Sequence, residues 1–347
     1  MPAAERPLPR FSDRSIGLAA AVVTVLVWTA FIVVARASAA HSLGPLDLAF
    51  ARIAGASVVL LPWGAWLVMR DRAARPGPAG RPAASLFGLS PLALRVTLIG
   101  GAFGGVAYAT FAYMGFFFAP AGHASVLMPG SLPLWTTLLA AWLLRDRLTL
   151  TRAIGLAFIV AGDLVVGGRS LLHAFEGGEV WKGDLLFMAA AFCWACYSIV
   201  ARHHRLDAVR ATIAITAFAF MAFLPVYTLL VALGAVQSRF GSAPVGEIVF
   251  QMAFQGIGSV VISGIAFTRM IQYFGPVRST MITALVPGLS ALGAVVFLDE
   301  PLSWSLWLGL GLVTAGILFG VRRSATAVLP VEPVAGPAPP VARRCDA

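Results

Sequence analysis

The sequence predicts an all-α polytopic membrane protein in which ten transmembrane helices form two inverted five-helix repeats. Three observations support this fold class: a strongly apolar composition, long apolar runs, and one spaced residue pattern that occurs twice. Of the 347 residues, 59% are hydrophobic and 12% are charged, and the mean hydropathy is +0.87. Soluble domains carry about 25% charged residues, so this chain has too few to coat a water-facing surface.

The apolar runs have the length of membrane-spanning helices, which need about 20 residues to cross about 30 Å of hydrocarbon. Strands of a membrane barrel instead alternate in character over about ten residues, so run length excludes a barrel. The ten runs lie at about 16–36, 46–69, 95–118, 122–144, 151–168, 183–202, 211–234, 247–273, 276–298 and 303–322. The fifth is the shortest, and the eighth is long enough to tilt or bend.

One spaced set of residues occurs twice, 154 positions apart. The first set is Pro133, Asp146, Leu148, Gly155 and Gly162, and the second is Pro287, Glu300, Leu302, Gly309 and Gly316. At an offset of 166 positions, Trp28 and Val34-Ala35-Arg36 match Trp194 and Val200-Ala201-Arg202. The pattern predicts two copies of one unit, at 16–168 and 183–322, joined by an extracytoplasmic linker at 169–182.

Each unit is expected to contain five helices, an odd number, so the second copy enters the membrane from the opposite side. Inverted copies related by an axis in the membrane plane can exchange roles and so generate two equivalent conformations. Such a chain holds its substrate near the midplane and exposes it to each side in turn. The repeat therefore predicts transport by alternating access.

The net charge of +10 reflects membrane topology. With the N-terminus placed inside, 20 of the 25 Lys and Arg residues face the cytoplasm, as the positive-inside rule requires. Both termini are then cytoplasmic: a short segment at 1–15 and a Pro-rich tail at 323–347 that is expected to be disordered. Arginine outnumbers lysine 24 to one, which suggests a GC-rich bacterial genome. We therefore expect a bacterial cytoplasmic (inner) membrane protein that binds no nucleic acid.

No motif of enzyme or metal chemistry is present in the sequence. It contains no P-loop, G-x-S-x-G or H-E-x-x-H pattern, so transport is expected to draw on a gradient, with no cofactor. Cys193 and Cys196 lie inside an apolar run, where a pair of small residues fits better than a redox site. No Cys/His cluster has the spacing of metal ligands.

Two segments resemble EamA-type transporters of the drug/metabolite transporter superfamily. They are Leu143–Thr149 followed by Gly155 and Gly162, and Val286–Leu302 followed by Gly309 and Gly316. Trp28 and Arg52 also fit that family, and the resemblance covers about residues 15–322. It implies ten helices in two inverted five-helix units, and secondary transport of small organic solutes, often export of amino acids or related metabolites. The chain departs from the family in having Asp146 for the usual Glu, and Asp163 where an apolar residue is common.

Arg52 is the main candidate for substrate binding because it lies some six residues into a membrane span. A charge in such a place costs about 2.5–3.5 kcal/mol, and it usually faces a cavity or a partner. Its guanidinium can bind a substrate carboxylate through two parallel hydrogen bonds. The alternatives are that it snorkels to the outer interface or forms a fixed ion pair with Asp47 or Asp163.

Further cavity candidates are aromatic or neutral polar residues. Trp28 and Trp194 lie at equivalent places near mid-helix rather than in the interfacial belts, so they either line a cavity or pack in the core. Tyr108 has the same two alternatives. Gln251 and Gln255 share one helix face, where they either hydrogen-bond the substrate or bridge helices.

Two residues are candidates for coupling transport to protons. Asp163 lies within a predicted span, where burial would favour its protonated form; otherwise it pairs with Arg52 or caps its helix. His123 opens the fourth span near the outer interface and can exchange a proton near neutral pH. The alternative for His123 is a hydrated interfacial histidine without a role in transport.

The repeat also predicts structural roles for two prolines and two acids. Pro133 and Pro287 each remove an intrahelical hydrogen bond and are expected to kink their helices as hinges. Asp146 and Glu300 stand at helix ends, where they are expected to satisfy backbone groups of turns rather than to touch substrate.

The leading functional hypothesis is a secondary transporter that exports a small polar metabolite, such as an amino acid. The alternatives are an importer of the same solute class and a flippase for lipid head groups. The expected partners are a small-molecule substrate, membrane lipid and protons as a coupling ion, and a homodimer is left open. The sequence predicts neither the substrate nor the direction of transport.

Overall fold

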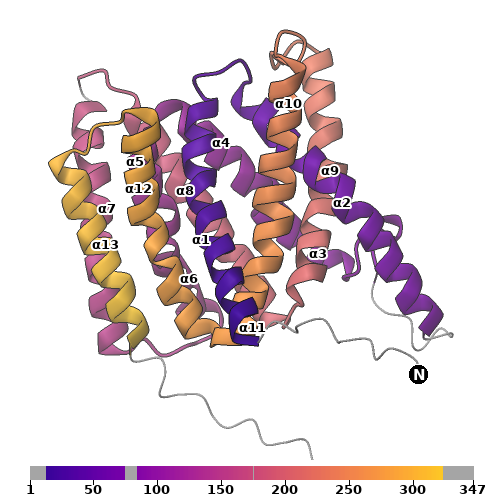
Figure 1. Cartoon of the computed structure of the whole chain (residues 1–347), viewed down its shortest axis with the longest axis horizontal. Helices are drawn as coiled ribbons and strands as arrows, with labels where there is room; N and C mark the ends of the chain where they lie inside the picture. The colour runs from indigo at the N-terminus through magenta and orange to yellow at the C-terminus, as the bar shows by residue number, and fades with distance from the viewer. Residues whose placement is uncertain (1–12, 75–83, 175, 323–347) are drawn as a thin grey trace, which may run out of the picture.

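Helices make up nearly all of the described chain, and most run the height of one bundle (Figure 1). The computed structural model describes residues 13–74, 84–174 and 176–322. Within these ranges no strand is present, and the one isolated bridge joins Ser85 to Ser90. Most of the expected N-terminal segment, part of the loop after the second span, and the tail at 323–347 lie outside the described residues.

Most helices are ordinary α-helices, and three of the helical stretches include a wider π-helical segment. In chain order they are α1 (Asp13–Ser38), α2 (Pro45–Ala74), the short 3₁₀ turn η2 (Leu86–Gly88), α3 (Leu94–Gly100), η3 (Gly101–Ala107), α4 (Tyr108–Phe118), α5 (Ala121–Ser125), η4 (Val126–Gly130), α6 (Leu132–Leu143), α7 (Leu150–Ala174), α8 (Val180–His203), α9 (Ala208–Ala232), α10 (Val245–Gln251), η5 (Met252–Ile262), α11 (Ser263–Thr283), α12 (Leu285–Leu298) and α13 (Trp304–Arg322). Helix α7 extends six residues into the expected linker at 169–182.

Eight helical stretches of the described chain are long and apolar enough to cross a membrane. They are Ser15–Ser38, Pro45–Ala74, Leu94–Phe118, Ala121–Leu143, Leu150–Ala174, Val180–His203, Ala208–Ala232 and Val245–Met270. Two shorter apolar helices follow, Leu285–Leu298 and Trp304–Phe319. The all-helical membrane class is therefore confirmed, and the first eight expected runs each correspond to a candidate span.

The expected run at 276–298 is not one helix. Helix α11 continues to Thr283, the helix is interrupted at Ala284, and α12 begins at Leu285. Pro287 accounts for the break, because it cannot donate to the carbonyl of Thr283 four residues earlier and its ring clashes with that carbonyl. Pro133 stands in the same way three residues after the end of η4, in the first turn of α6.

The bundle has two distinct ends. In Figure 1 the upper end holds the connections α1–α2, α4–α5, α7–α8, α9–α10 and α12–α13. The lower end holds the connections α2–α3, α6–α7, α8–α9 and α11–α12.

Helices α7 and α13 pack closely along their lengths through glycines of the repeat pattern. A Cβ atom on Gly162 would lie 2.8 Å from the carbonyl oxygen of Gly309, and one on Gly316 would lie 2.6 Å from that of Gly155. Small residues let membrane helices approach to backbone contact. Gly162 and Gly309 of the first contact are the repeat equivalents of Gly316 and Gly155 of the second. The two contacts are therefore equivalent.

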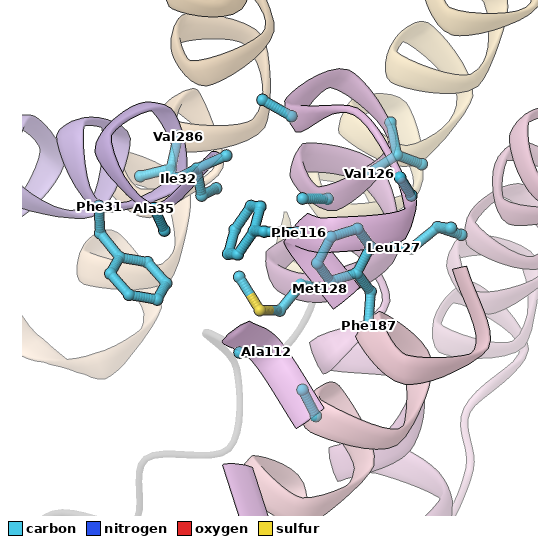
Figure 2. Close-up of a cluster of buried hydrophobic side chains, with 14 of the residues drawn as sticks. Phe31, Ile32, Ala35, Ala112, Phe116, Val126, Leu127, Met128, Phe187 and Val286 are labelled. Carbon is cyan, nitrogen blue, oxygen red and sulfur yellow. The ribbon is translucent and has the colours of Figure 1, made fainter. Parts of the chain in front are cut away.

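The largest buried cluster lies where α1, α4, η4, α8 and α12 meet (Figure 2). Phe116 stands at its centre, with its ring centroid 4.9 Å from that of Phe187 and 6.1 Å from that of Phe31. Both pairs have the edge-to-face arrangement that aromatic rings prefer. The cluster extends from Ala284 at the lower α11–α12 connection to Ala119 at the upper α4–α5 connection, and Phe116, near the end of α4, lies in its upper part.

Candidate functional site

A cavity of about 650 Å³ lies between the two halves of the chain. That volume is in the range of about 300–1,000 Å³ typical of pockets for small molecules. Its walls come from α1, α2, η3, α4, η4, α6, α8, α9, η5, α11 and α12. At the lower end it reaches the α8–α9 connection, where Leu206, Asp207 and Ala208 line it. Among the described residues, none from the connections at the upper end lines it.

Aromatic rings from both halves form much of the cavity wall. The rings of Trp28 and Phe267 lie 5.1 Å apart, and those of Tyr108 and Trp194 lie 4.9 Å apart. Tyr197 continues the second group, with its ring 5.2 Å from that of Trp194. Three of the predicted candidates, Trp28, Tyr108 and Trp194, therefore lie on the cavity wall.

Arg52 projects from α2 into the same cavity. Its Nη1 atom donates to the Ser259 hydroxyl at 2.9 Å and to the Gln255 carbonyl at 3.4 Å. The guanidinium carbon also lies 5.3 Å from the ring centroid of Phe31 and 6.0 Å from that of Tyr108. Within the described chain no carboxylate forms an ion pair with Arg52. The cation is thus held by neutral groups and ring faces.

The expected acidic partners of Arg52 are bonded elsewhere or stand apart. Asp47 is buried at the start of α2, where it accepts from the backbone N–H groups of Gly44 at 2.8 Å and Arg239 at 3.1 Å. Asp163 is 7% exposed on α7 and does not line the cavity. Neither carboxylate oxygen of Asp163 has a hydrogen-bond partner among the described residues.

Six serine and threonine hydroxyls also lie on the cavity wall. They belong to Ser198, Thr212, Thr216, Ser259, Ser263 and Thr268. Several already donate within their own helices, as Thr212 does to the Ala208 carbonyl at 2.8 Å. Arg52 is consequently the one cationic side chain that the described cavity wall contains, and Asp207 at the lower end is its one acid.

The two glutamines lie behind the cavity wall. Gln251 donates from Nε2 to the Ser38 hydroxyl at 2.8 Å, which ties α10 to the end of α1. Gln255 is fully buried, and its Oε1 accepts from the Tyr113 hydroxyl at 3.0 Å. Gln255 does not line the cavity, but its backbone carbonyl accepts from Arg52, which does.

His123 belongs to a separate polar cluster near the upper end. Its Nδ1 atom lies 2.9 Å from Oδ1 of Asp184 at the start of α8. The second oxygen of Asp184 accepts from the Ser170 hydroxyl on α7. This cluster joins α5, α7 and α8, and its residues do not line the cavity.

Asp146 and Glu300 each contact an arginine of the other repeat. Glu300 accepts from Arg36 Nε at 3.0 Å, and also from the backbone N–H groups of Ala121 at 3.2 Å and Gly122 at 3.3 Å. Asp146 Oδ2 lies 2.8 Å from Nη2 of Arg202. The backbone partners of Glu300 therefore belong to the α4–α5 connection rather than to its own turn.

Several cavity residues were not among the sequence candidates. Phe31 and Tyr197 follow Trp28 and Trp194 by three positions, so helical spacing alone places them on the same faces. Ser259 and Phe267 had no such signal, since their place depends on how η5 packs on α2 and α11 on α1. Arg36 was visible as a repeat position, but the sequence did not identify its partner.

Comparison with known sequences identifies the chain's relatives. It matches the EamA-like transporter family twice, over residues 15–168 and 181–322. The chain belongs to the EamA-like transporter family. The resemblance seen in the sequence is therefore confirmed, and the protein is a transmembrane transporter.

Individual relatives agree with this membership. An uncharacterized transporter of Archaeoglobus fulgidus is 24% identical to this EamA-like transporter over 228 residues, which cover 64% of this chain and 76% of the relative. The uncharacterized transporter YyaM of Bacillus subtilis is 30% identical over 76 residues, 22% of this chain and 25% of YyaM. The names of these relatives indicate a transporter, not an enzyme.

One protein of known crystal structure has a similar fold. It is 22% identical to this EamA-like transporter, covers 91% of this chain and all of its own, and superposes with a TM-score of 0.51. At this level of identity the likeness shows the fold alone.

Proposed function

We propose that this EamA-like transporter is a secondary transporter that exports a small polar organic metabolite, an amino acid or a related compound, by alternating access. The observation that carries the proposal is the cavity between the two halves, which reaches the lower end and stops below the packed upper end. A central site reached from one side is the form that each conformation of such a transporter takes.

Two sets of contacts support an inverted relation between the repeats. Exchanging the two repeats turns the contact of Gly162 with Gly309 into that of Gly316 with Gly155. The crossing of α7 and α13 is therefore unchanged by this exchange. The Arg36–Glu300 pair at the upper end corresponds to the Arg202–Asp146 pair at the lower end. An exchange between opposite ends is expected for an axis that lies in the membrane plane. In this arrangement α12 and α13 are the last two of ten spans.

The cavity chemistry favours a solute with an anionic group and an apolar, flat body. Arg52 can donate to a carboxylate, and its position among neutral partners leaves its charge without an anion from the described chain. Trp28, Trp194 and Tyr108 offer ring faces to an apolar body or to the ammonium group of a zwitterion. An amino acid with a large side chain has the carboxylate, the ammonium group and the apolar body that these residues can bind.

The charge distribution indicates which end of the bundle faces the cytoplasm. Eight arginines from the end of α2, the α6–α7 region and the α8–α9 region lie at the lower end: Arg70, Arg72, Arg145, Arg147, Arg152, Arg202, Arg205 and Arg210. By the positive-inside rule that end is cytoplasmic. The cavity then faces the cytoplasm, where it can load a metabolite made in the cell.

Asp163 and His123 are the proposed proton carriers. The carboxylate of Asp163 is buried, and neither of its oxygens has a hydrogen-bond partner among the described residues. His123 contacts Asp184 next to α7, the helix that carries Asp163. Both lie outside the cavity, so a proton would act through the packing of α7 rather than by touching the substrate.

Metabolite export by cells tests the proposal. Extracellular and intracellular small molecules are compared by mass spectrometry in cells expressing the wild type, Arg52→Ala or Arg52→Lys at matched membrane abundance. We expect the wild type to export a carboxylate-bearing metabolite, and Arg52→Ala to export it at least about tenfold more slowly, as for loss of a charged hydrogen bond. Arg52→Lys keeps the charge without the planar fork and should fall between them.

Two outcomes would count against the proposal. Equal export by all three proteins would remove Arg52 from substrate binding. If the purified wild type moved none of a broad panel of amino acids and organic acids in proteoliposomes, in exchange or under an imposed gradient, the proposed substrate class would be wrong.

A further inference from the structure

Two ion pairs occupy equivalent positions of the two repeats, at opposite ends of the bundle. Arg36 and Glu300 are 3.0 Å apart at the upper end, and Arg202 and Asp146 are 2.8 Å apart at the lower end. Arg36 matches Arg202, and Glu300 matches Asp146, in the repeat pattern. Each pair joins a residue of one repeat to a residue of the other, so neither pair can persist unchanged if the halves move apart at that end.

The upper pair holds three elements together. Arg36 at the end of α1 donates through Nε to Glu300 and through Nη1 to the Phe116 carbonyl at 2.7 Å. Glu300 after α12 also accepts from the N–H groups of Ala121 and Gly122. All of these hydrogen bonds are charge-assisted, which makes them stronger than neutral ones. They close the α4–α5 connection against both α1 and the α12–α13 turn, directly beside the Phe116 cluster of Figure 2.

The lower pair is much more hydrated. The side chains of Arg202 and Asp146 are 57% and 31% exposed, against 32% and 16% for Arg36 and Glu300. Ion pairs in contact with water add little stability, because solvent screens them. The better buried pair is therefore at the packed end, and the hydrated pair is at the end that the cavity reaches.

We propose that the Arg36–Glu300 and Arg202–Asp146 pairs are two repeat-related clamps, each of which closes its own end of the transport path. In the conformation described both pairs are formed, but the upper pair is the better buried and lies at the packed end, whereas the lower pair is more exposed and lies at the end that the cavity reaches. In the opposite conformation the roles exchange, and Arg202 and Asp146 become the buried pair. This proposal rests on the proposed alternating access, and it makes these four residues determinants of which side is open.

The clamps predict opposite changes in access at the two ends. Weakening the upper clamp removes stabilisation that only the upper-closed conformation has, so the population shifts toward the upper-open one. A thiol below the upper end should then react faster, and a thiol in the lower cavity should react more slowly. A variant that merely loosens the fold would speed both reactions.

The test measures thiol labelling by a hydrophilic maleimide on purified protein in proteoliposomes permeable to the reagent. Cys193, Cys196 and Cys345 are first replaced by Ser, and one reporter is added at a time. Ala35→Cys reports on the upper end, since Ala35 is 0% exposed and adjoins Arg36. Thr212→Cys reports on the lower cavity, whose wall contains Thr212.

Glu300→Gln is the test variant and Asp146→Asn its repeat-equivalent control. We expect Glu300→Gln to raise the labelling rate of Ala35→Cys about tenfold and to lower that of Thr212→Cys, as a population shift of this size requires. Asp146→Asn makes the same carboxylate-to-amide change in the hydrated pair. It should leave the Ala35→Cys rate within about twofold of the parent protein.

Unchanged rates at both reporters with Glu300→Gln would overturn the proposal, and so would faster labelling at both. If Glu300→Gln yields no monodisperse protein, Arg36→Gln is judged by the same criterion. Labelling needs no substrate, so a wrong substrate class would not alter the outcome. Reciprocal labelling without any solute flux would leave the clamps supported and reject the proposed substrate.

Discussion

The upper end of this transporter is packed shut by side chains that bond across the repeats, whereas the lower end keeps a cavity of about 650 Å³. Both ends are built from the same spaced residues, for example Glu300 above and Asp146 below. The ends therefore differ in how these residues are packed more than in which residues they carry. Because the two halves are repeats, one conformation shows the same set of equivalent residues in a closed end and in an open end.

The largest effect is expected from Phe116, whose ring fills the upper cluster (Figure 2). Phe116→Ala should destabilise the protein by about 3–5 kcal/mol, because it leaves a cavity among rigid neighbours. Phe267→Ala at the cavity wall should cost clearly less, since its ring already borders open space. Thermal unfolding of the purified proteins in detergent measures both, and equal losses would contradict the contrast between the two ends.

A smaller difference is expected between two capping acids. Asp47 at the upper end is buried and also accepts from the Tyr227 hydroxyl, so Asp47→Ala leaves buried donors unsatisfied and should cost about 2–3 kcal/mol. Asp207 at the lower end is exposed and accepts from the N–H group of Arg210 at 3.0 Å. Asp207→Ala should cost about 1 kcal/mol, as for an ordinary helix cap. Denaturant titration of each variant checks the order, which a larger loss for Asp207→Ala would reverse.

The smallest effect is expected at an exposed ion pair of the upper end, where the location is the same as for Asp47 but the burial is not. Lys182 contacts Glu179 in the α7–α8 connection, at the upper end but in contact with solvent. Lys182→Ala should change stability by under about 0.5 kcal/mol, because an exposed ion pair is hydrated and costly in side-chain entropy. A loss near that of Asp47→Ala in the same unfolding assay would show that the upper end is sensitive everywhere, not only where it is dry.

Composition and repeat spacing were enough to predict the helical membrane fold and the first eight spans. They also singled out Gly155, Gly162, Gly309 and Gly316, which the structure brings together between α7 and α13. The sequence predicted a kink at Pro287, but it did not place the boundary between two helices at Ala284, where the structure has it. Hydropathy alone cannot place such a break, because both sides of it are apolar.

The candidate site was predicted in part for a related reason. Trp28, Arg52, Tyr108 and Trp194 line the cavity, since an unusual residue within an apolar span can be seen from its own helix. Gln255 looks the same in sequence, yet it points to Tyr113 behind the wall. Which face of a helix meets the cavity depends on its neighbours, and the pairing of η5 with α2 is a long-range contact that spacing within one helix does not reveal.

The glycine crossing of α7 and α13 separates the parts of the chain that can evolve from those that cannot. One methyl group on Gly316 would lie 2.6 Å from a backbone oxygen, which no change of a neighbouring side chain can relieve. On the cavity wall, the side chains around Arg52 border open space, although Gly104 is restricted there because a Cβ atom on it would lie 2.7 Å from the ring of Tyr197. New solute preferences can therefore arise by substitution around Arg52 while Gly162, Gly309 and Gly316, which do not line the cavity, stay fixed.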